Sequence, residues 1–279
     1  MKALHLVLAS ILIFASAVHL AGSDQAFGID TLPVLYSDSS LVVEADQAAP
    51  VPATSPRVQM FRLHLREGIR GDFSVDQLLA FVPRSGGVVE SAQFSNAMVF
   101  LAGPLSQGQL AEWGIDSTEP IFQVAGGKGG IVPKTPVLRP EVERFLSISD
   151  FASPEAFAWA TQNMLSSDPF LQRSAAYKLG RYETKIALDV LQKAVRSSKV
   201  TLPNQEFVIQ IIAADGSDHA LSILKSIAED KKTEKPVRIA TIYAVRDVVG
   251  GMKLLENWSK AADVVLQKTS TKVIQMSRD

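Results

Sequence analysis

Two different patterns of hydrophobic and polar positions divide the chain. Between residues 30 and 135, short apolar runs are separated by glycine or proline at intervals of about ten residues. Between residues 168 and 266, apolar residues recur three or four positions apart. The first pattern is typical of short strands and the second of amphipathic helices. We therefore expect an α+β protein in two domains, with an N-terminal small antiparallel β barrel or sandwich and a C-terminal α-solenoid of about three helix pairs.

The strands of the first region are expected at its apolar runs, namely Leu41–Val43, Val58–Leu65, Leu78–Val82, Met98–Leu101 and Ile121–Val124. The apolar phase in the second run moves by one residue between Met60 and Phe61, which predicts a β-bulge there. The segment Gln47–Pro56 contains three prolines, so we expect it to be an exposed loop.

The second region predicts three helix pairs. Asp168 is a typical N-cap and Pro169 suits the first helical position, so the first helix begins there and ends at Gly180. The other predicted helices are Glu183–Ser197, Pro203–Ala214, Ser217–Glu229, Pro236–Val249 and Met252–Leu266. The dipeptide Ala-Leu at position 187 recurs at position 220. A helix pair that recurs every 33 residues is typical of an α-solenoid, and an ordinary helical bundle is the alternative.

Net charge also differs between the two halves. Residues 24–152 carry 9 Lys plus Arg and 15 Asp plus Glu, whereas residues 153–279 carry 18 and 14. Such asymmetry supports two domains and lets them attract each other. The expected organisation is a signal peptide at 1–23, a β domain at 24–139, a linker or short helix at 140–152, a HEAT-like solenoid at 153–268 and a C-terminal tail at 269–279.

The N-terminus has the three parts of a secretory signal peptide. Lys2 precedes the apolar run Ala3–Val18, and small residues at Ala15–Ala17 or Ala21–Ser23 offer a cleavage site. An uncleaved membrane anchor is the alternative. The chain has no cysteine, so its domains must fold without disulfides, which suits the bacterial periplasm or exterior. We expect a secreted or periplasmic protein with no membrane contact after signal removal.

Composition excludes several kinds of chemistry. Without cysteine there is no disulfide scaffold, thiolate metal site or cysteine nucleophile. The net charge of −1 disfavours a nucleic-acid ligand. After signal removal, His64 and His219 remain in different domains, which does not suit the usual zinc site. No serine-hydrolase or metalloprotease motif is present. We therefore nominate no catalytic, cofactor-binding or metal-binding residue, and expect no cofactor.

Three weaker features have both a functional and a structural interpretation. Arg62, His64 and Arg66 alternate on one strand face and could bind an anion, but this pattern is more typical of a solvated face that prevents edge pairing. Gly126–Gly130 could cradle a phosphate, but it lacks P-loop spacing and leads into a strand, so we predict a flexible hairpin. Trp113, Trp159 and Trp258 are expected to be core or partner-facing aromatic residues.

The N-terminal half resembles a recurrent β domain of uncharacterised secreted bacterial proteins, which is similar to an OB-type barrel. Four segments carry this resemblance in order: Ser40–Asp46, Phe61–Leu63 with Gly68, Met98–Leu101, and Phe122–Gly130. It covers about residues 33–136 and departs from the pattern at Gln47–Pro50, where a valine run and a glycine are replaced. The resemblance implies a barrel and carries no catalytic residue.

The segment Asp168–Gly180 resembles the first helix of the HEAT-like repeats of phycobilin lyases and many bacterial scaffolds. This resemblance covers about residues 153–266 and implies a protein-binding or spacer surface. We therefore expect an exported, non-enzymatic protein-interaction or scaffold protein with an unidentified protein partner and no nucleic acid. The alternatives are an enzyme without a recognisable motif, acting in a cleft between the two domains, and a membrane-tethered scaffold with an uncleaved N-terminus.

Overall fold

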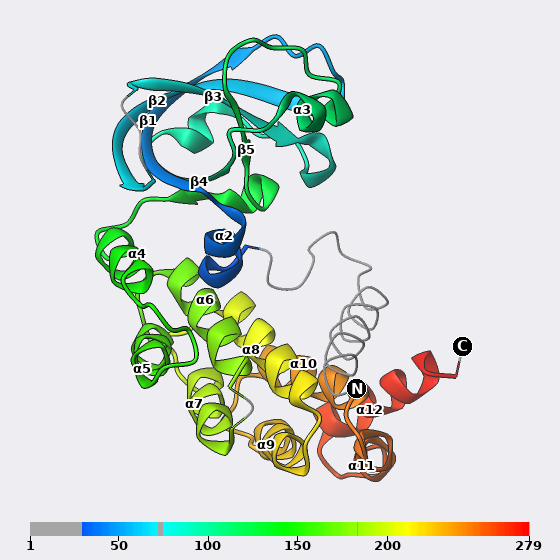
Figure 1. Cartoon of the computed structure of the whole chain (residues 1–279). Coiled ribbons are helices and arrows are strands. Elements are labelled where there is room, and N and C mark those ends of the chain that lie inside the picture. Colours follow the sequence, from blue (N-terminus) through cyan, green and yellow to red (C-terminus); the bar gives the residue numbers. More distant parts are fainter. Residues whose placement is uncertain (1–29, 72–74, 183, 279) are drawn as a thin grey trace, which may run out of the picture. The chain divides into compact units, whose positions relative to one another are not determined.

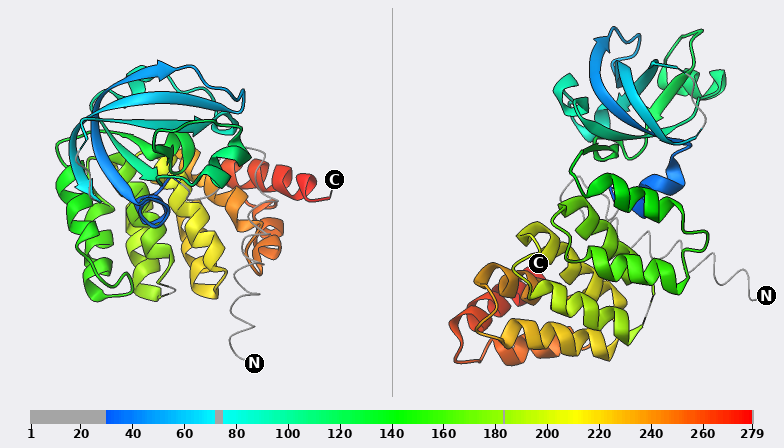
Figure 2. Two further views of the ribbon diagram at one scale, coloured as in Figure 1. Left: turned by 45° about the horizontal axis from the view of Figure 1, so that its top comes forward. Right: turned by 90° about the vertical axis from the view of Figure 1, so that its left-hand side faces the viewer.

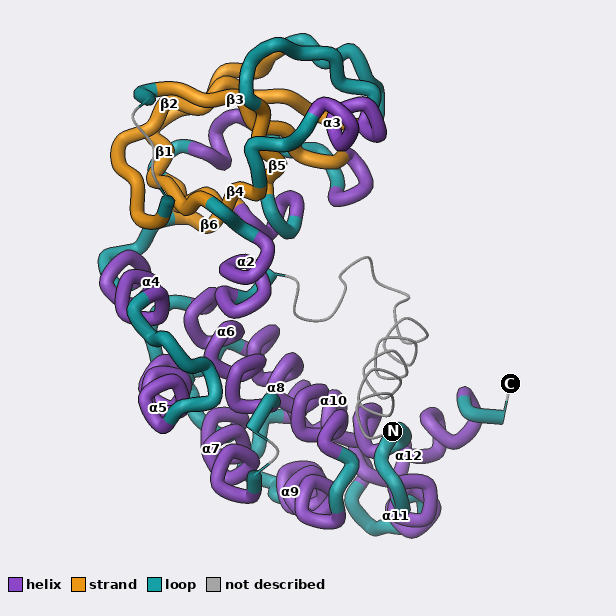
Figure 3. Tube along the Cα trace, in the orientation of Figure 1, coloured by secondary structure: helices purple, strands orange, loops and turns teal. Residues whose placement is uncertain are grey.

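The computed structural model describes residues 30–71, 75–182 and 184–278, and the chain divides into two compact units, one ending at Thr135 and the other beginning at Pro136. The predicted signal peptide lies outside the described residues. Strands gather in the first unit, and the second contains helices (Figures 1 and 3). The mixed α+β class is thereby confirmed as a β barrel followed by a helical unit.

Five strands close into a barrel within the described part of the first unit. They are β1 (Leu41–Val51), β2 (Val58–Arg70), β3 (Gln77–Pro83), β4 (Ala97–Ala102) and β5 (Ile121–Val124). Their order is β1-β2-β3-β5-β4, and β4 pairs again with β1. The pairing of β3 with β5 is parallel and the others are antiparallel. The short β6 (Ile131–Pro133) pairs with β4 at residues 97–99, and α2 (Leu32–Asp38) contacts β4.

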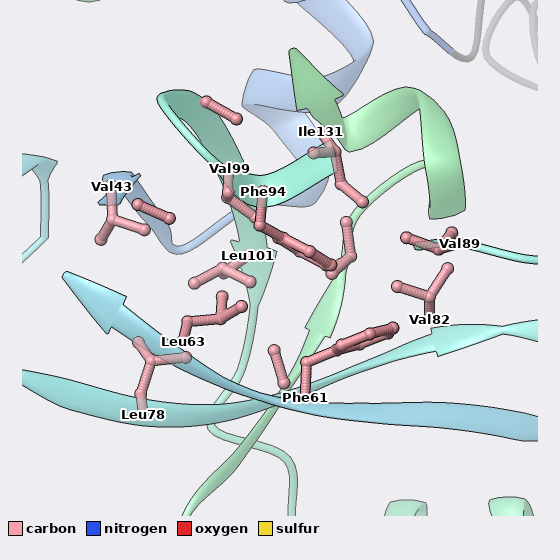
Figure 4. Close-up of a cluster of buried hydrophobic side chains, with 14 of the residues drawn as sticks. Val43, Phe61, Leu63, Leu78, Val82, Val89, Phe94, Val99, Leu101 and Ile131 are labelled. Carbon is pink, nitrogen blue, oxygen red and sulfur yellow. The ribbon is translucent and has the colours of Figure 1, made fainter. Parts of the chain in front are cut away.

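The barrel interior is filled by aliphatic side chains and two phenylalanines (Figure 4). Phe61 of β2 contacts Phe94 at a ring-centroid distance of 4.8 Å. Phe94 ends the 3-10 turn η2 (Ser91–Phe94) and is fully buried. Alternate residues of each strand face this interior because side chains in a strand point to opposite sides. The labelled members of the cluster are Val43, Phe61, Leu63, Leu78, Val82, Val89, Phe94, Val99, Leu101 and Ile131.

The predicted bulge between Met60 and Phe61 is wrong. The pairing of β2 with β3 is continuous from Val58 to His64, and the register shifts occur instead where β2 pairs with β1, from His64 onward. The apolar phase changes because both faces of β2 are buried: Phe61 faces the barrel interior, whereas Met60 packs with the helix α3 (Gln107–Trp113) in a second cluster. When both faces of a strand are buried, consecutive residues can both be apolar, and the sequence then looks as if the alternation had shifted by one residue.

Two further expectations for this unit require correction. The segment Gln47–Val51 belongs to β1, so only residues 52–57 form the connection to β2. Pro50 is tolerated because this end of β1 pairs only with β2 among the described strands, and edge positions accommodate proline. Gly126–Gly130 forms a 3-10 turn, η3 (Gly127–Gly130), that leads from β5 to β6. It is not a hairpin, because β5 and β6 both pair with β4.

The second unit contains nine helices among its described residues: α4 (Leu138–Leu146), α5 (Pro154–Asn163), α6 (Pro169–Gly180), α7 (Lys185–Val195), α8 (Leu202–Asp215), α9 (Asp218–Glu229), α10 (Lys235–Val245), α11 (Gly251–Trp258) and α12 (Val264–Met276). The helix predicted at 252–266 is two helices, because Asp263 caps a new one. The expected C-terminal tail therefore lies largely in α12. Helix α4 overlaps the segment expected as a linker or short helix.

The helices of this unit begin at regular intervals. Helices α6, α8 and α10 have their N-caps at Asp168, Thr201 and Glu234, which are evenly spaced, and we call the step from 168 to 201 the repeat interval. Helices α7, α9 and α11 have theirs at Thr184, Ser217 and Gly250, at the same interval. Helix α6 packs on α8, α8 on α10 and α10 on α12, and these helices lie side by side in the views of Figure 2.

Truncation of either of two equivalent leucines tests this packing. Leu191 of α7 and Leu224 of α9 lie one repeat interval apart, and both are completely buried. Leu191→Ala or Leu224→Ala should lower the free energy of unfolding by about 2–5 kcal/mol, because each leaves a cavity. The exposed Lys193→Ala should change it by less than about 0.5 kcal/mol. Urea denaturation followed by circular dichroism measures both, and equal effects of the three variants would contradict the packing.

Candidate functional site

The candidate site lies on the exposed face of α6, α8 and α10. Because the N-caps of these helices are evenly spaced, equivalent positions in them are also separated by the repeat interval. Beyond the first residue of each helix, three such positions remain at least partly exposed in every one of the three helices, while their neighbours are mostly buried. They are Phe170, Pro203 and Pro236; Arg173, Glu206 and Ile239; and Tyr177, Gln210 and Tyr243.

An open groove of about 580 Å³ runs between α8 and α10 on this face. Its apolar surface comes from Pro236, Ile239, Ala240 and the ring of Tyr243, all on α10. Its polar groups are Glu206 and Gln210, one helical turn apart on α8, and Lys235 at the beginning of α10. The groove thus combines an apolar floor with a carboxylate, an amide and an ammonium group.

The polar side chains of the groove have no partners of their own. No side-chain hydrogen bond or ion pair to another described residue is made by four of these groups: Glu206, Gln210, Lys235 and the hydroxyl of Tyr243. An amide offers both donors and acceptors, and a carboxylate accepts only. These groups can therefore bond to the exposed backbone of another chain, while the apolar floor buries one of its side chains. This is the chemistry of a site that recognises a polypeptide segment.

Two buried side chains, each one residue before a groove residue in the sequence, hold the groove helices in place. Gln205 of α8 is buried and donates to the carbonyl oxygens of Val195 and Ser197, at 2.9 and 3.2 Å, at the end of α7. Arg238, its equivalent in α10, donates through Nε to the carbonyl of Ala228 at 2.7 Å, near the end of α9. Carbonyls in the last turn of a helix lack partners within that helix. Each donor therefore fixes its helix against the preceding one.

Arg238 also connects the groove helix α10 to α12. Its Nη2 lies 2.9 Å from Oδ2 of Asp263, and both side chains are largely buried. Asp263 caps α12 by accepting the backbone N–H groups of Val265 and Leu266 at 2.9 and 3.1 Å. The hydrogen bond from the Leu266 N–H, aided by Arg238 and opposed by burial, lowers the pKa of Asp263. The carboxylate is thereby kept ionised next to the buried guanidinium.

A buried lysine in the same unit was not identified from the sequence. The ammonium of Lys178 on α6 lies 5.5 and 5.1 Å from the ring centroids of Phe151 and Tyr182, and it donates to the carbonyl of Phe151. Burial lowers the pKa of Lys178 and raises the pKa of Tyr182. The Tyr182 hydroxyl donates to the same carbonyl at 3.2 Å. Both groups fasten the segment before α5 to the end of α6.

The cationic strand face noted in the sequence is occupied by the protein's own groups. Arg62 forms a two-bonded pair with Glu119 at 3.1 and 3.3 Å, and Arg66 lies 4.0 Å from Asp46. His64 contacts the amide of Gln77 at 3.3 Å. The predicted role in preventing edge pairing does not apply to Arg62 and His64, because there β2 pairs with β1 on one side and β3 on the other. The pairs are exposed and add little stability individually.

The remaining residues singled out from the sequence are distributed over both units. His219 on α9 contacts Asp189 on α7 at 3.1 Å. Trp159 is fully buried, and the Trp258 indole donates to Glu229 at 2.9 Å. Trp113 is half-buried, and the guanidinium carbon of Arg57 lies over its ring, 5.2 Å from the ring centroid. Within the described ranges, no three His, Asp or Glu residues gather as metal ligands, and no helix has the length and hydropathy needed to cross a membrane.

The lowered pKa of Asp263 predicts how stability depends on pH. A carboxyl group whose pKa is lower in the folded state stabilises the fold above its unfolded pKa of about 3.9, and this contribution is lost as the pH falls through the folded value. The stability difference between the wild type and Asp263→Asn should be largest near neutral pH and shrink below about pH 4. Asparagine keeps the cap, so the comparison isolates the charge.

Thermal unfolding of the two proteins between neutral and acidic pH measures this difference. Asp263→Ala, which also removes the cap, should be less stable than Asp263→Asn by about 0.5–2 kcal/mol near neutral pH. A wild-type advantage that stays constant down to the lowest pH would show that the Asp263 charge does not contribute.

No model of a known protein family matches this chain, and no curated protein matches it. The functional interpretation therefore depends on the groove and on the residues that build it.

Proposed function

We propose that this is an exported, non-enzymatic protein-interaction or scaffold protein, and that the groove between α8 and α10 receives an extended segment of a protein partner. The observation that carries the proposal is the combination in that groove of an apolar floor with unpartnered polar side chains. Burial of an apolar side chain supplies affinity, and polar groups around it fix register and orientation. Glu206 and Lys235 provide one charge of each sign.

The shape and surroundings of the groove favour a polypeptide over a small molecule. Small-molecule sites enclose most of their ligand, whereas this groove is open to solvent. The equivalent positions of α6 extend the same face with Phe170, Arg173 and Tyr177. The Arg173 guanidinium stacks on Phe207 of α8 at 4.2 Å, so it joins the surfaces of the two helices. Aromatic residues and arginine are the side chains enriched in protein interfaces.

We propose further that residues 168–266 are three helical repeats, each one repeat interval long, that stack as a solenoid. Three observations support this: the regular N-cap positions, the successive packing of α6, α8 and α10, and the equivalent inter-helix donors Gln205 and Arg238. In such arrays each repeat is stabilised by its neighbours, and the aligned faces form an extended binding surface. The HEAT-like resemblance of the first repeat agrees with this arrangement.

The barrel contributes differently to the proposed function. Its strand order and the parallel pairing of β3 with β5 support the proposed OB-type arrangement. Barrels of that type often bind oligonucleotides on the face of strands 2 and 3. Here α3 and the residues after it pack against Val58, Met60 and Phe81 on that side of the sheet. A covered face and paired arginines support a structural module without a nucleic-acid ligand.

Export is the part of the proposal that depends on sequence alone. The basic residue, the apolar run and the small residues that suggest a secretory signal all precede residue 24, outside the described residues. We propose that the secreted or periplasmic protein lacks this segment and acts away from the membrane. N-terminal sequencing of protein purified from its source tests the proposal, because a chain that still begins at Met1 would favour the membrane-tethered alternative.

Substitutions in the groove test the interaction site. Peptides of about a dozen residues selected by phage display against the full chain should lose at least tenfold in affinity with Gln210→Ala or Ile239→Asp, a loss of about 1.4 kcal/mol. The first removes a polar contact and the second places a charge on the apolar floor. Gln267→Ala, an equivalent change at an exposed position of α12, is the control. Fluorescence anisotropy measures binding, and selected peptides unaffected by both groove variants would exclude this site.

Truncation tests the proposed stacking. A chain that ends at residue 233 lacks α10, α11 and α12 and exposes the faces of α8 and α9 that α10 covers. In a solenoid the preceding helix pair loses a neighbour that stabilises it, so its unfolding should occur at lower denaturant concentration than in the full chain. Circular dichroism during urea denaturation measures the shift. Unchanged stability of the remaining helices would show that the helix pairs are independent.

A further inference from the structure

A second groove lies between α9 and α11. It has a volume of about 310 Å³ and is open to solvent. Two leucines, Leu221 on α9 and Leu254 on α11, form its floor. Five polar residues surround them: Asp218, Ser222 and Lys225 from α9, and Lys253 and Asn257 from α11. The groove lies between different helices from the one proposed above, so the inference drawn from it does not depend on that site.

The floor of this groove is unusually open. Leu221 and Leu254 follow Leu188 of α7 by one and two repeat intervals, and Leu188 is only 5% exposed, yet both are half-buried. Leu221 thus lies partly at the surface. Gly250 caps α11 where α7 and α9 have Thr184 and Ser217. A Cβ at Gly250 would lie 3.4 Å from Cδ2 of Leu221, so glycine leaves this leucine uncovered.

Positive charge predominates around the leucines. Lys225 and Lys253 stand on opposite sides of the groove, are exposed, and form no ion pair with a described residue. Asp218 is the carboxylate among the lining residues, and it lies in the first turn of α9, where the helix dipole stabilises a negative charge.

We infer that the groove between α9 and α11 binds an acidic linear segment of a partner protein, with an aliphatic side chain between carboxylates. The aliphatic group contacts Leu221 and Leu254, and the carboxylates pair with Lys225 and Lys253. Pairing is favourable because neither lysine gives up an intramolecular partner. A nucleic acid is the less suitable anion, because single-stranded ligands require a row of cations and aromatic rings for stacking, and this floor is aliphatic.

A designed peptide tests the inference on the full chain. A fluorescein-labelled peptide of repeating Leu-Glu-Glu units should bind at least tenfold more tightly, in low salt, than its Leu-Gln-Gln and Leu-Lys-Lys analogues. Lys225→Glu or Lys253→Glu should weaken its binding at least tenfold. Ser222→Trp, which fills the groove without changing its charge, should do the same. Lys193→Glu on α7 is the matched control, because Lys193 is an exposed lysine outside the groove, and it should change affinity less than threefold.

Each result has a defined meaning. Equal affinity for the Leu-Glu-Glu and Leu-Gln-Gln peptides would overturn the charge-based recognition. Equal losses with Lys193→Glu and Lys225→Glu would reduce it to a general charge effect, and unchanged affinity with Ser222→Trp would place the peptide elsewhere. A labelled single-stranded oligonucleotide that binds with the same dependence on Lys225 would assign the groove to nucleic acid instead. Circular dichroism confirms that each variant is folded.

Discussion

Carbonyl groups at the ends of helices need hydrogen bonds, and the helical unit depends on how they are satisfied. The last turn of a helix leaves carbonyls without partners, and burying them unpaired is costly. Here Gln172 donates to the carbonyl of Ser166 after α5, Gln205 to that of Val195 in α7, and Arg238 to that of Ala228 in α9. Successive donors are evenly spaced along the chain, so the same requirement is met in the same way at α6, α8 and α10.

That spacing also creates the candidate sites. Once α6, α8 and α10 are fixed in register, their equivalent outward positions form rows across neighbouring helices. The rows differ in chemistry, as in Tyr177, Gln210 and Tyr243, because these positions take no part in the inter-helix core. The donors one position away are buried and constrained. A rigid frame with variable outer residues is an effective basis for recognition, because little order has to be imposed on binding.

The barrel is stabilised mainly by apolar packing, since several of its strands are buried on both faces. Interior residues such as Phe61 pack around Phe94, while Met60 and Phe81 pack outward with α3. Several polar groups of the unit pair within it. Glu44 on β1 is 3% exposed and pairs with Lys134 at 2.5 Å, and Arg70 donates to the carbonyls of Tyr36 and Ser39.

The sequence by itself determined the order of the five barrel strands and of helices α6 to α10, because periodicity and capping are local: Asp168 with Pro169 marks the start of α6, and apolar runs mark the strands. It did not predict the helices α2, α3 and α5. It could not distinguish a bulge at Met60 from two buried faces, because that depends on packing partners. The division of the last predicted helix rests on a local cap, in which Asp263 accepts the N–H groups of Val265 and Leu266, and the apolar spacing alone does not reveal it. The two grooves could not be predicted from the sequence either. Whether Gln210 or Lys225 lies beside an apolar floor is decided by residues of a neighbouring helix, and only tertiary packing brings those together.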